Sequence, residues 1–415
     1  MRRFYQGRDL SRVHTIEELA WIAKRCLPYF AWEYLAGGAE AELTLADNRR
    51  DFDRLGLLPR TLRGIDAPAL ETRLFGQATA MPMAIAPTGY NAMLYRNADI
   101  HLARAATEAG IPFCMSTVST SSMEEVVAHV PGVNLWFQLY CLNDPAIQED
   151  LLKRAQSLQV STLLLTSDAV TLGNREWDKR NFIRPRQLSL RNKLDVLRHP
   201  AWIRRALWPS GMPSLGNLNP YLPAHARTAA GAAHFIGQAM DATLDWNALA
   251  KLRDRWPGNL VLKGVLHPGD AERALALGLD GIVVTNHGGR QLDGSPSSIR
   301  ALAGIRSAVK GKMQILFDSG VRRGTDVAKA LALGADAVLV GRPTLYGVAA
   351  AGQQGAAKAL CILAEELKRT MILLGSSRLD ELNEDQLFDR MGAFYGTEPP
   401  VAAIDKRPCE WPIMQ

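Results

Sequence analysis

The stretch Asn-His-Gly-Gly-Arg-Gln-Leu-Asp at 286–293 brings together several groups that can do chemistry. His287 can act as a base near neutral pH, because the ordinary pKa of histidine is about 6.5. Arg290 can hold a carboxylate through two parallel hydrogen bonds, and Gly288 and Gly289 let the backbone approach a ligand closely. The stretch therefore predicts a site that binds an organic anion and moves a proton.

Two further loops carry glycines next to arginines. One is Asp318-Ser-Gly320-Val-Arg322-Arg-Gly324, and the other is Gly341-Arg342-Pro343. Glycine amides and guanidinium groups suit a phosphate, and α/β barrels often hold a phosphate on the loops after their last two strands. We therefore expect these two loops to share one phosphate site.

These loops follow short apolar segments that alternate with amphipathic segments along the chain, a pattern that predicts βα units and a parallel sheet. The candidate strands are 81–86, 112–117, 133–139, 162–167, 260–263, 281–285, 314–318 and 337–340. The clearest helices between and after them are 100–109, 145–158, 269–277, 298–309, 324–333 and 352–374. Eight such strands predict a closed (β/α)8 barrel, the TIM-barrel class of α/β folds.

Polar side chains recur at the carboxyl ends of all the candidate strands, where an α/β barrel gathers its reactive groups. Three pairs are spaced i, i+2, so that both members face the same side of a strand; these are Gln138 with Tyr140, Thr166 with Asp168, and Thr285 with His287. The other positions are Pro87, Thr88, Gly89, Ser116, Lys263, Asp318, Gly341 and Arg342. Any one of them has an ordinary structural explanation, but their coincidence predicts a single site.

The rest of the chain flanks or interrupts the predicted barrel, which takes residues 76–175 and 241–375 of a single domain. Residues 1–75 have a helical pattern, and residues 376–415 form a tail. Residues 176–240 are an insertion, because more than ninety residues separate the fourth and fifth strands whereas βα loops usually have about 2–6. The candidate catalytic residues lie on the barrel, so we expect the chemistry not to depend on the segment 179–208.

The insertion contains a basic segment, 179–208, with nine Lys or Arg residues and one acid, Asp195. The segment therefore has a net charge of +8, whereas the whole chain has +6, so the rest of the chain has −2. This uneven distribution disfavours a protein that coats nucleic acid. With Trp202, Ile203, Leu207 and Trp208 the segment suits an anionic membrane surface. The alternative is a solvated basic lid that attracts an anionic substrate.

Composition excludes several other classes of protein. Apolar residues make up 47% and charged residues 22% of the chain, values of an ordinary globular protein. The five cysteines are odd in number and scattered, and no cluster of His, Cys and carboxylate residues has ligand spacing, so we expect neither a disulfide framework nor a metal site. No run of 18 apolar residues and no export signal is visible, so we expect a cytoplasmic protein without a membrane span.

From about Leu27 to Gly375 the sequence resembles the FMN-dependent family that oxidises L-2-hydroxy acids, which includes glycolate oxidase and the L-lactate and (S)-mandelate dehydrogenases. Separate motifs carry the resemblance, namely Leu27-Pro28, Tyr34, Gly38-Ala39-Glu40, Ala86 to Gly89, Trp136 to Tyr140, Gly173 with Arg175-Glu176, Lys263-Gly264, Asn286 to Asp293, Asp318 to Asp326 and Gly341 to Pro343. One departure is Thr285, where the family usually has Ser; the hydroxyl is kept, and the extra methyl adds bulk beside the flavin.

The resemblance implies that the protein uses FMN to oxidise an L-2-hydroxy acid to the 2-oxo acid. His287 matches the family's base and Asp168 its acidic partner. The residues that match the substrate-binding positions, for carboxylate or hydroxyl, are Tyr34, Tyr140, Arg175 and Arg290. Lys263 matches the cation beside the flavin, where reduction places negative charge.

The resemblance also implies where FMN binds. The residues that match the positions around the flavin ring are Pro87, Thr88, Gly89, Ser116, Gln138, Thr166, Lys263 and Thr285. Asp318 matches the ribityl contact, and the phosphate positions are Gly320, Arg322, Gly341 and Arg342.

Substrate, electron acceptor and location stay open at this point. The residues Pro87 to Gly89 with Asn91 look like the mandelate branch, whereas 209–217 looks like the lactate branch. We expect a homo-oligomer, a tetramer by resemblance, that lies on the cytoplasmic face of the inner membrane through 179–208 and passes electrons to quinone. Gly89, where soluble oxidases tend to have Ala, favours this over the alternative of a soluble oxidase that makes H₂O₂ from O₂.

A non-catalytic protein that binds through its basic patch is a third alternative. It is disfavoured because His287, Arg175, Arg290 and Lys263 are all present, and a protein that only binds has no chemical need for this set.

Overall fold

The computed structural model describes residues 4–5, 7–184, 187–209, 211–222, 227 and 235–390. Eight parallel strands close into a barrel in which the last strand pairs with the first. They are β4 (Met83–Ile85), β5 (Phe113–Ser116), β6 (Leu135–Tyr140), β7 (Thr162–Thr166), β10 (Asn259–Val265), β11 (Gly281–Val284), β12 (Gln314–Phe317) and β13 (Ala337–Val340). All eight coincide with the predicted strands to within two residues at each end, so the (β/α)8 prediction is confirmed.

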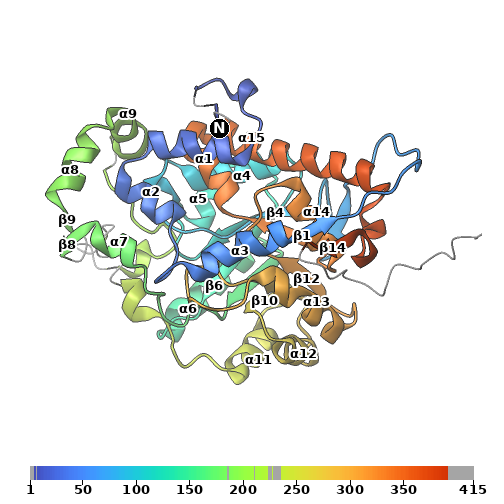
Figure 1. Ribbon diagram of the computed structural model, residues 1–415. Helices are drawn as coiled ribbons and strands as arrows, with labels where there is room; N and C mark the ends of the chain where they lie inside the picture. Colours follow the sequence, from blue (N-terminus) through green and yellow to red (C-terminus); the bar gives the residue numbers. More distant parts are fainter. Residues whose placement is uncertain are drawn as a thin grey trace, which may run out of the picture.

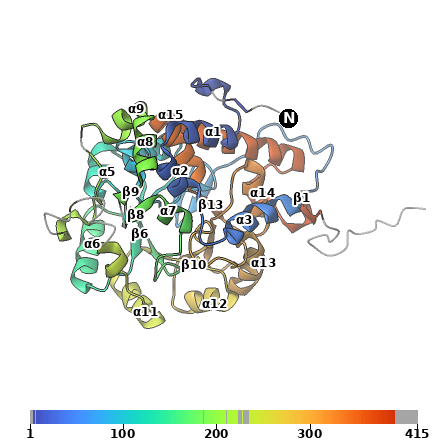
Figure 2. The same ribbon diagram turned by 60° about the vertical axis from the view of Figure 1, so that its left-hand side comes forward.

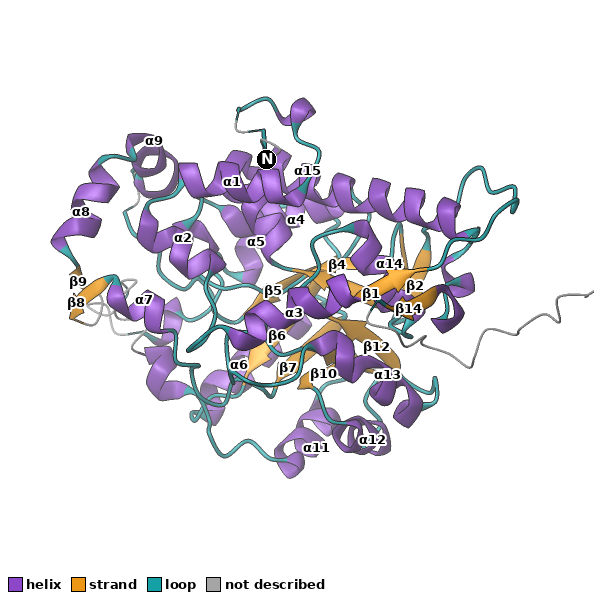
Figure 3. Ribbon diagram, in the orientation of Figure 1, coloured by secondary structure: helices purple, strands orange, loops and turns teal. Residues whose placement is uncertain are grey.

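Helices surround the barrel (Figures 1 and 3). They are α4 (Ala98–Glu108), α5 (Met123–His129), α6 (Pro145–Ser157), α11 (Trp246–Arg255), α12 (Pro268–Ala276), α13 (Ser298–Val309), α14 (Gly324–Ala332) and α15 (Arg342–Leu374). The last helix begins directly after β13, ten residues earlier than predicted, and its helical geometry is interrupted at Ala351 and Gly352. Its amino terminus therefore points at the end of the barrel that holds the predicted phosphate site.

The barrel interior is a packed core that is closed at the amino-terminal end of the strands. Trp136 of β6 is fully buried there. The hairpin of β2 (Thr72–Leu74) and β3 (Gln77–Thr79) brings Phe75 against the Trp136 ring, with the ring centroids 5.4 Å apart in an edge-to-face arrangement. The hairpin thus plugs one end and leaves the carboxyl-terminal end for the site.

The predicted helical segment 1–75 is correct only in its first part. Helices α1 (Ile16–Cys26), α2 (Tyr29–Ala36) and α3 (Leu43–Arg54) are present, and Thr15 with Glu18 forms the capping box of α1. The chain then becomes extended: β1 (Leu55–Leu57) pairs with β14 (Leu387–Asp389), and β2 pairs with β3. A pairing with residues more than three hundred positions away leaves no local pattern, which explains the error. The part 376–390 of the predicted tail contains β14 and two short 3₁₀ turns, η6 (Leu379–Glu381) and η7 (Glu384–Gln386), whereas 391–415 lies outside the described residues.

The described part of the insertion after β7 folds against the amino-terminal helices (Figures 1 and 2). It contains α7 (Glu176–Arg180), the short pair β8 (Phe182–Arg184) and β9 (Gln187–Leu188), α8 (Leu190–Leu197), α9 (Pro200–Trp202), the π-helical turn η3 (Ile203–Leu207) and the 3₁₀ turn η4 (Asn219–Tyr221). Trp202 is 3% exposed, packs edge-to-face on Phe30 and donates a hydrogen bond to the Met93 carbonyl. This corrects the expectation for Trp202: it anchors the insertion to the fold, and of the two tryptophans only Trp208 faces solvent.

Within the described residues, no helix combines the length and the hydropathy that crossing a bilayer requires.

Candidate active site

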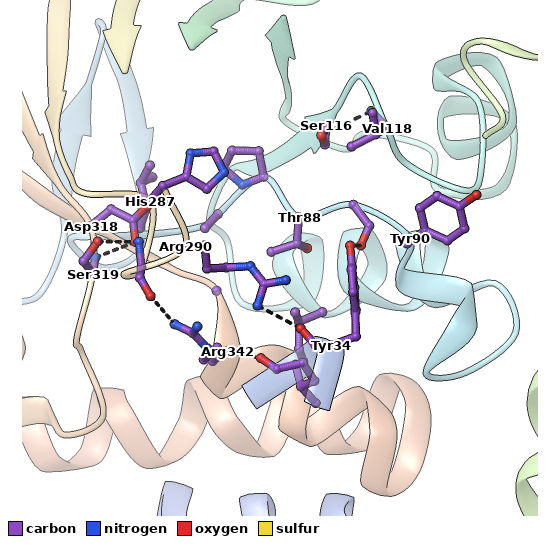
Figure 4. A pocket seen from close by; sticks show the side chains of 18 of the residues that line it. Tyr34, Thr88, Tyr90, Ser116, Val118, His287, Arg290, Asp318, Ser319 and Arg342 are labelled. Atoms are coloured by element: carbon purple, nitrogen blue, oxygen red, sulfur yellow. Dashed lines mark hydrogen bonds between the residues drawn. The ribbon is translucent and has the colours of Figure 1, made fainter. Parts of the chain in front are cut away.

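A cavity of about 270 Å³ opens at the carboxyl-terminal end of the barrel. Its lining comes from strands β5, β6, β10 and β13 and from the segments that follow β4, β7, β11 and β12 (Figure 4). The predicted site residues that line it are Tyr34, Pro87, Thr88, Gly89, Ser116, Tyr140, Arg175, Lys263, His287, Arg290, Asp318, Gly320, Arg322, Gly341 and Arg342. Gln138, Thr166, Asp168 and Thr285 do not line the cavity but are hydrogen-bonded to the lining, directly or through one another. The sequence-predicted residues thus lie together.

His287 and Asp168 are hydrogen-bonded at the cavity wall. His287 Nδ1 lies 2.9 Å from Asp168 Oδ1, which leaves Nε2 as the ring nitrogen free to face a ligand. Burial lowers the pKa of His287, and the carboxylate of Asp168 opposes this effect. Burial acts to raise the pKa of Asp168, but His287 and Lys263 outweigh it and hold this pKa below its ordinary value. An ionised Asp168 next to a neutral His287 is the arrangement of a base that is ready to take a proton.

The loop that carries His287 is fixed by its own backbone conformation and by α3. His287, Gly288 and Gly289 all have positive φ values of 59°, 70° and 72°. Such a conformation is strained for a histidine and is retained where its surroundings enforce it. Asn286 and Asn48 of α3 exchange two amide hydrogen bonds of 2.9 and 2.8 Å. The imidazole is therefore held in one direction before any ligand binds.

Two arginines give the cavity an excess of positive charge beside His287. Arg290 donates to the carbonyl oxygens of Tyr34 and Gly37 at 2.8 and 2.7 Å. Burial, together with the charges of the nearby Arg175 and Arg342, lowers the pKa of Arg290 to about 9. The buried Nε of Arg175 has no hydrogen-bond partner among the described residues. An anion placed between Arg175 and Arg290 would supply this partner and relieve the repulsion.

Two tyrosines complete this part of the cavity. The Tyr34 hydroxyl donates to the carbonyl oxygen of Gly89 at 3.1 Å, and the Arg290 guanidinium lies 5.1 Å from the centre of the Tyr34 ring. Burial raises the pKa of Tyr140, and the charge of Asp168 adds to this effect. Tyr140 therefore stays a protonated hydrogen-bond donor beside the site.

A buried row of polar side chains runs along the barrel ends behind the cavity. Ser116 Oγ donates to Gln138 Oε1 at 2.7 Å, and Gln138 Nε2 donates to Thr166 Oγ1 at 2.9 Å. Lys263, 3% exposed, lies near this row with its Nζ 3.7 Å from Asp318 Oδ2. The Thr285 hydroxyl donates to the same carboxylate oxygen at 3.2 Å. The row presents a buried cation and fixed polar groups to one side of the cavity.

The opposite end of the cavity is built from glycines and arginines. Gly320 has φ +88°, and a Cβ there would lie 2.5 Å from the Asn48 carbonyl oxygen, so only glycine fits. Gly341 precedes the first turn of α15, whose free amides and dipole favour an anion. Burial lowers the pKa of Arg342 to about 10, and Arg322 contributes to the same shift. This end suits a phosphate group, as the sequence predicted.

Arg322 and Arg323 are adjacent but have different surroundings. Arg322 lines the cavity, whereas Arg323 forms ion pairs with Glu366 at 3.0 Å and Glu17 at 3.5 Å. Asp326 accepts hydrogen bonds from both backbone amides and from Arg49. The carboxylate of Asp326 thereby fixes the loop that aims Arg322 at the cavity.

The loop with Thr88 and Gly89 is held from behind by a buried carboxylate that the sequence did not single out. Asn91 Nδ2 donates to the Thr88 carbonyl at 3.0 Å and to Asp99 Oδ1 at 2.7 Å. Asp99 also accepts from the backbone and hydroxyl of Thr120. The network ties the loop after β4 to the loop after β5, which places both on one wall of the cavity.

Sequence reasoning missed the apolar side of the cavity and Ser319. Ser319 Oγ accepts a hydrogen bond from the Gly288 amide at 2.9 Å. Its position next to Asp318 in the predicted loop could have identified it as a site residue. The apolar lining includes Tyr90, Val118, Leu172, Leu215, Ile236 and Met240. Leu215, Ile236 and Met240 belong to the insertion but lie outside 179–208, so the expectation that the chemistry does not depend on 179–208 stays a prediction.

Comparison with known proteins places these features in a family context. Residues 23–389 match the family described as FMN-dependent dehydrogenase. The chain is 41% identical over 379 residues to an L-lactate dehydrogenase of Pseudomonas paraeruginosa, an alignment that covers 89% of this chain and 97% of the relative.

Solved structures show the same similarity. The crystal structure of the monotopic membrane protein (S)-mandelate dehydrogenase has a TM-score of 0.86 and 38% sequence identity, over 91% of this chain and 99% of that one. A mandelate oxidase solved with (S)-4-hydroxymandelic acid has a TM-score of 0.77 and 35% identity, over 90% of this chain and 98% of that one.

Proposed function

The chain belongs to the FMN-dependent dehydrogenase family, and on that premise we propose that it oxidises an L-2-hydroxy acid to the 2-oxo acid in the cavity around His287. The observation that carries this proposal is the position of the His287–Asp168 pair beside Arg290 and Arg175. A base, its acidic partner and two carboxylate-binding guanidiniums within one cavity match the functional groups of a 2-hydroxy acid.

The residues of the cavity fit FMN at both of its ends. Gly320, Arg322, Gly341 and Arg342 would hold the phosphate, and Asp318 the ribityl chain. The residues around the flavin ring would be Pro87, Thr88, Gly89, Ser116, Gln138, Thr166, Lys263 and Thr285. The negative charge of a bound phosphate would offset the burial and the neighbouring positive charge that lower the pKa of Arg342. When bound, FMN supplies the acceptor for the two electrons that leave the substrate.

The substrate carboxylate would bind between Arg175 and Arg290. The Nε of Arg175 offers an unused hydrogen bond, and burial of Arg290 strengthens its attraction to an anion. Tyr34 and Tyr140 would add hydroxyl contacts to the carboxylate or to the substrate hydroxyl. Fixing the carboxylate and the hydroxyl at once leaves C2 in one orientation, which is how the site would select the L enantiomer.

His287 Nε2 would take the proton from the substrate, at the hydroxyl or at C2. The proton makes the imidazole a cation, and the carboxylate of Asp168 at 2.9 Å stabilises that cation. Lys263 would stabilise the negative charge that reduction brings to its side of the cavity. The apolar lining from Leu215, Ile236 and Met240 favours an apolar substituent on C2, as in lactate- or mandelate-type acids.

We propose further that the protein attaches peripherally to the cytoplasmic face of the inner membrane and delivers electrons to quinone. Helix α8 exposes Leu190, Leu194 and Leu197, at 69%, 51% and 69%, in one row. Arg191, Lys193 and Arg198 lie within or directly after this stretch of the chain, and Trp208 is 70% exposed. An apolar row with basic neighbours suits an anionic bilayer surface, and the similar mandelate dehydrogenase is described as a monotopic membrane protein.

Steady-state assays test the function and the acceptor together. Turnover with an artificial dye or a soluble quinone should be faster with L- than with D-2-hydroxy acids and faster than turnover with O₂. Peroxide formation at the full turnover rate would instead identify a soluble oxidase. A homo-oligomer, a tetramer by family resemblance, remains part of the proposal and is tested by light scattering in detergent-free buffer.

A further inference from the structure

A second cavity, of about 520 Å³, lies between the amino-terminal region, α9 and α15. It shares only Leu94 with the active-site cavity. Its walls come from the region before α1, from α1 itself, from the segment 198–205 of the insertion and from Ala349 to Ala351. The insertion is held in place here, because Arg96 donates to the Trp208 carbonyl and its backbone amide to the Arg205 carbonyl. The cavity is therefore a fixed feature of the joint between the insertion and the barrel domain.

Four guanidinium groups from three segments surround this cavity. Arg8 precedes α1, Arg25 lies in its last turn, and Arg198 and Arg205 come from the insertion. Burial raises the pKa of the Cys26 thiol, while the charges of Arg205, Arg8 and Arg25 oppose this shift. These three arginines and Cys26 line the same cavity.

No carboxylate lines this cavity in the described part of the chain. The acid nearest in sequence to its wall is Asp195, which accepts a hydrogen bond from the Tyr29 amide at 2.6 Å and lies 3.7 Å from His199. Among the described residues, Arg8, Arg198 and Arg205 form no ion pair. A concave site lined by charges of one sign concentrates an anion of opposite charge.

The cavity also has apolar residues in its lining, and one of its arginines directly follows α8 in the chain. Leu10, Ile22 and Trp202 form part of its lining. Arg198 follows Leu197 directly, so the cationic rim begins where the leucine row of α8 ends. A ligand with an anionic head and an apolar body would satisfy both surfaces at once.

We propose that this cavity binds the phosphate group of an anionic glycerophospholipid, with the headgroup among the four arginines and the acyl chains directed along α8. Guanidinium groups are the side chains best suited to bind phosphate through paired hydrogen bonds. The proposal goes beyond general attraction to a membrane, because it assigns a discrete, saturable site. It rests on the proposed membrane attachment for access to lipid, but binding in the cavity is measurable without a membrane.

The test uses the FMN-loaded protein and dihexanoylphosphatidylglycerol below its micelle concentration, measured by isothermal titration calorimetry. The pocket variant carries Arg198→Gln and Arg205→Gln. The matched control carries Arg191→Gln and Arg204→Gln, which removes the same charge from the same segment outside the cavity. We expect saturable binding of one lipid per chain, weakened at least about tenfold in the pocket variant and unchanged in the control. Equal weakening in both variants, or no saturable binding to the unaltered protein, would overturn the proposal.

Two further titrations identify the source of the phosphate. Inorganic phosphate and dihexanoylphosphatidylcholine should both bind at least about tenfold more weakly than the anionic lipid, because the first lacks the acyl chains and the second carries a cation. Inorganic phosphate that binds as tightly as the lipid would overturn the lipid assignment. Lipid binding in solution without attachment to vesicles would contradict only the membrane proposal, whereas attachment without binding in solution would contradict only the pocket.

Discussion

His287 Nδ1 lies 2.9 Å from Asp168 Oδ1, although the two residues are 119 positions apart in the chain. Each follows a barrel strand, β11 and β7 respectively, and these two strands flank β10. The contact fixes which ring nitrogen faces the cavity. It also places a carboxylate next to the imidazole, and this carboxylate stabilises the ring more strongly when His287 is protonated.

This pair predicts a specific pH dependence. His287 accepts a proton only when it is neutral, and burial lowers its pKa below the ordinary histidine value of about 6.5. Activity should therefore be full near neutral pH and fall only as the pH drops through that lowered pKa. Asp168→Asn removes the charge that raises the pKa of His287, so the acidic limb should move to lower pH and kcat should fall about 10²-fold or more. Asp195→Asn, which alters the His199 contact outside the cavity, is the control and should change neither. An unmoved limb in Asp168→Asn would contradict the assignment.

Arg290→Met should chiefly weaken binding of the substrate carboxylate. We expect KM for an L-2-hydroxy acid to rise about tenfold or more, since hydrogen bonds between charged groups are lost. The methyl ester of the same acid should be affected much less, because it carries no negative charge. Arg191→Met in the exposed basic segment is the control. Equal losses for acid and ester would show that Arg290 does not bind the carboxylate.

Gly89→Ala should introduce a steric conflict inside the cavity wall. A Cβ at position 89 would lie 2.5 Å from Val118 Cγ2, so the Val118 side chain or one of the two loops must shift. We expect slower turnover with FMN still bound, because the wall moves relative to the substrate. Val118→Ala removes the conflicting methyl, and the double variant should recover part of the lost rate. A double variant as slow as Gly89→Ala would place the cause elsewhere.

Replacing the leucine row of α8 should release the protein from membranes without harming its chemistry. Leu190→Ser, Leu194→Ser and Leu197→Ser together should weaken co-sedimentation with phosphatidylglycerol vesicles at least about tenfold, because apolar contacts with the bilayer are lost. Leu58→Ser, Leu62→Ser and Leu373→Ser alter exposed leucines outside the insertion and serve as the control. Raised salt should loosen the unaltered protein only in part, since it screens charge and not apolar contact. Vesicle binding unchanged in the α8 variant would contradict the proposed attachment surface.

The barrel and most of the site could be predicted from sequence because both depend on local patterns. Each strand is a short apolar run, and its polar end is fixed in sequence relative to that run, as Thr285 and His287 are to β11. The parts that failed depend on distant partners. Phe75 becomes a plug only against Trp136, and Trp202 becomes an anchor only against Phe30.

The apolar side of the cavity was also beyond sequence reasoning. Leu215 lies in an irregular stretch, whereas Ile236 and Met240 lie in or directly after the short helical stretch 235–239; neither stretch is long enough for a periodic pattern to show which way an apolar residue faces. Asp99 illustrates the same limit for polar groups. It lies on α4, fully buried, and only the fold shows that it holds Asn91 against the Thr88 loop.

The most direct test of the proposed chemistry is the visible absorption spectrum of the FMN-loaded protein under anaerobic conditions before and after addition of an L-2-hydroxy acid. We predict that L-lactate or L-mandelate bleaches the flavin bands in a single exponential phase, that the D enantiomers do not, and that His287→Ala binds FMN but bleaches at least about 10²-fold more slowly. A flavin that stays oxidised with every L-2-hydroxy acid, or that bleaches equally fast in His287→Ala, would contradict the account.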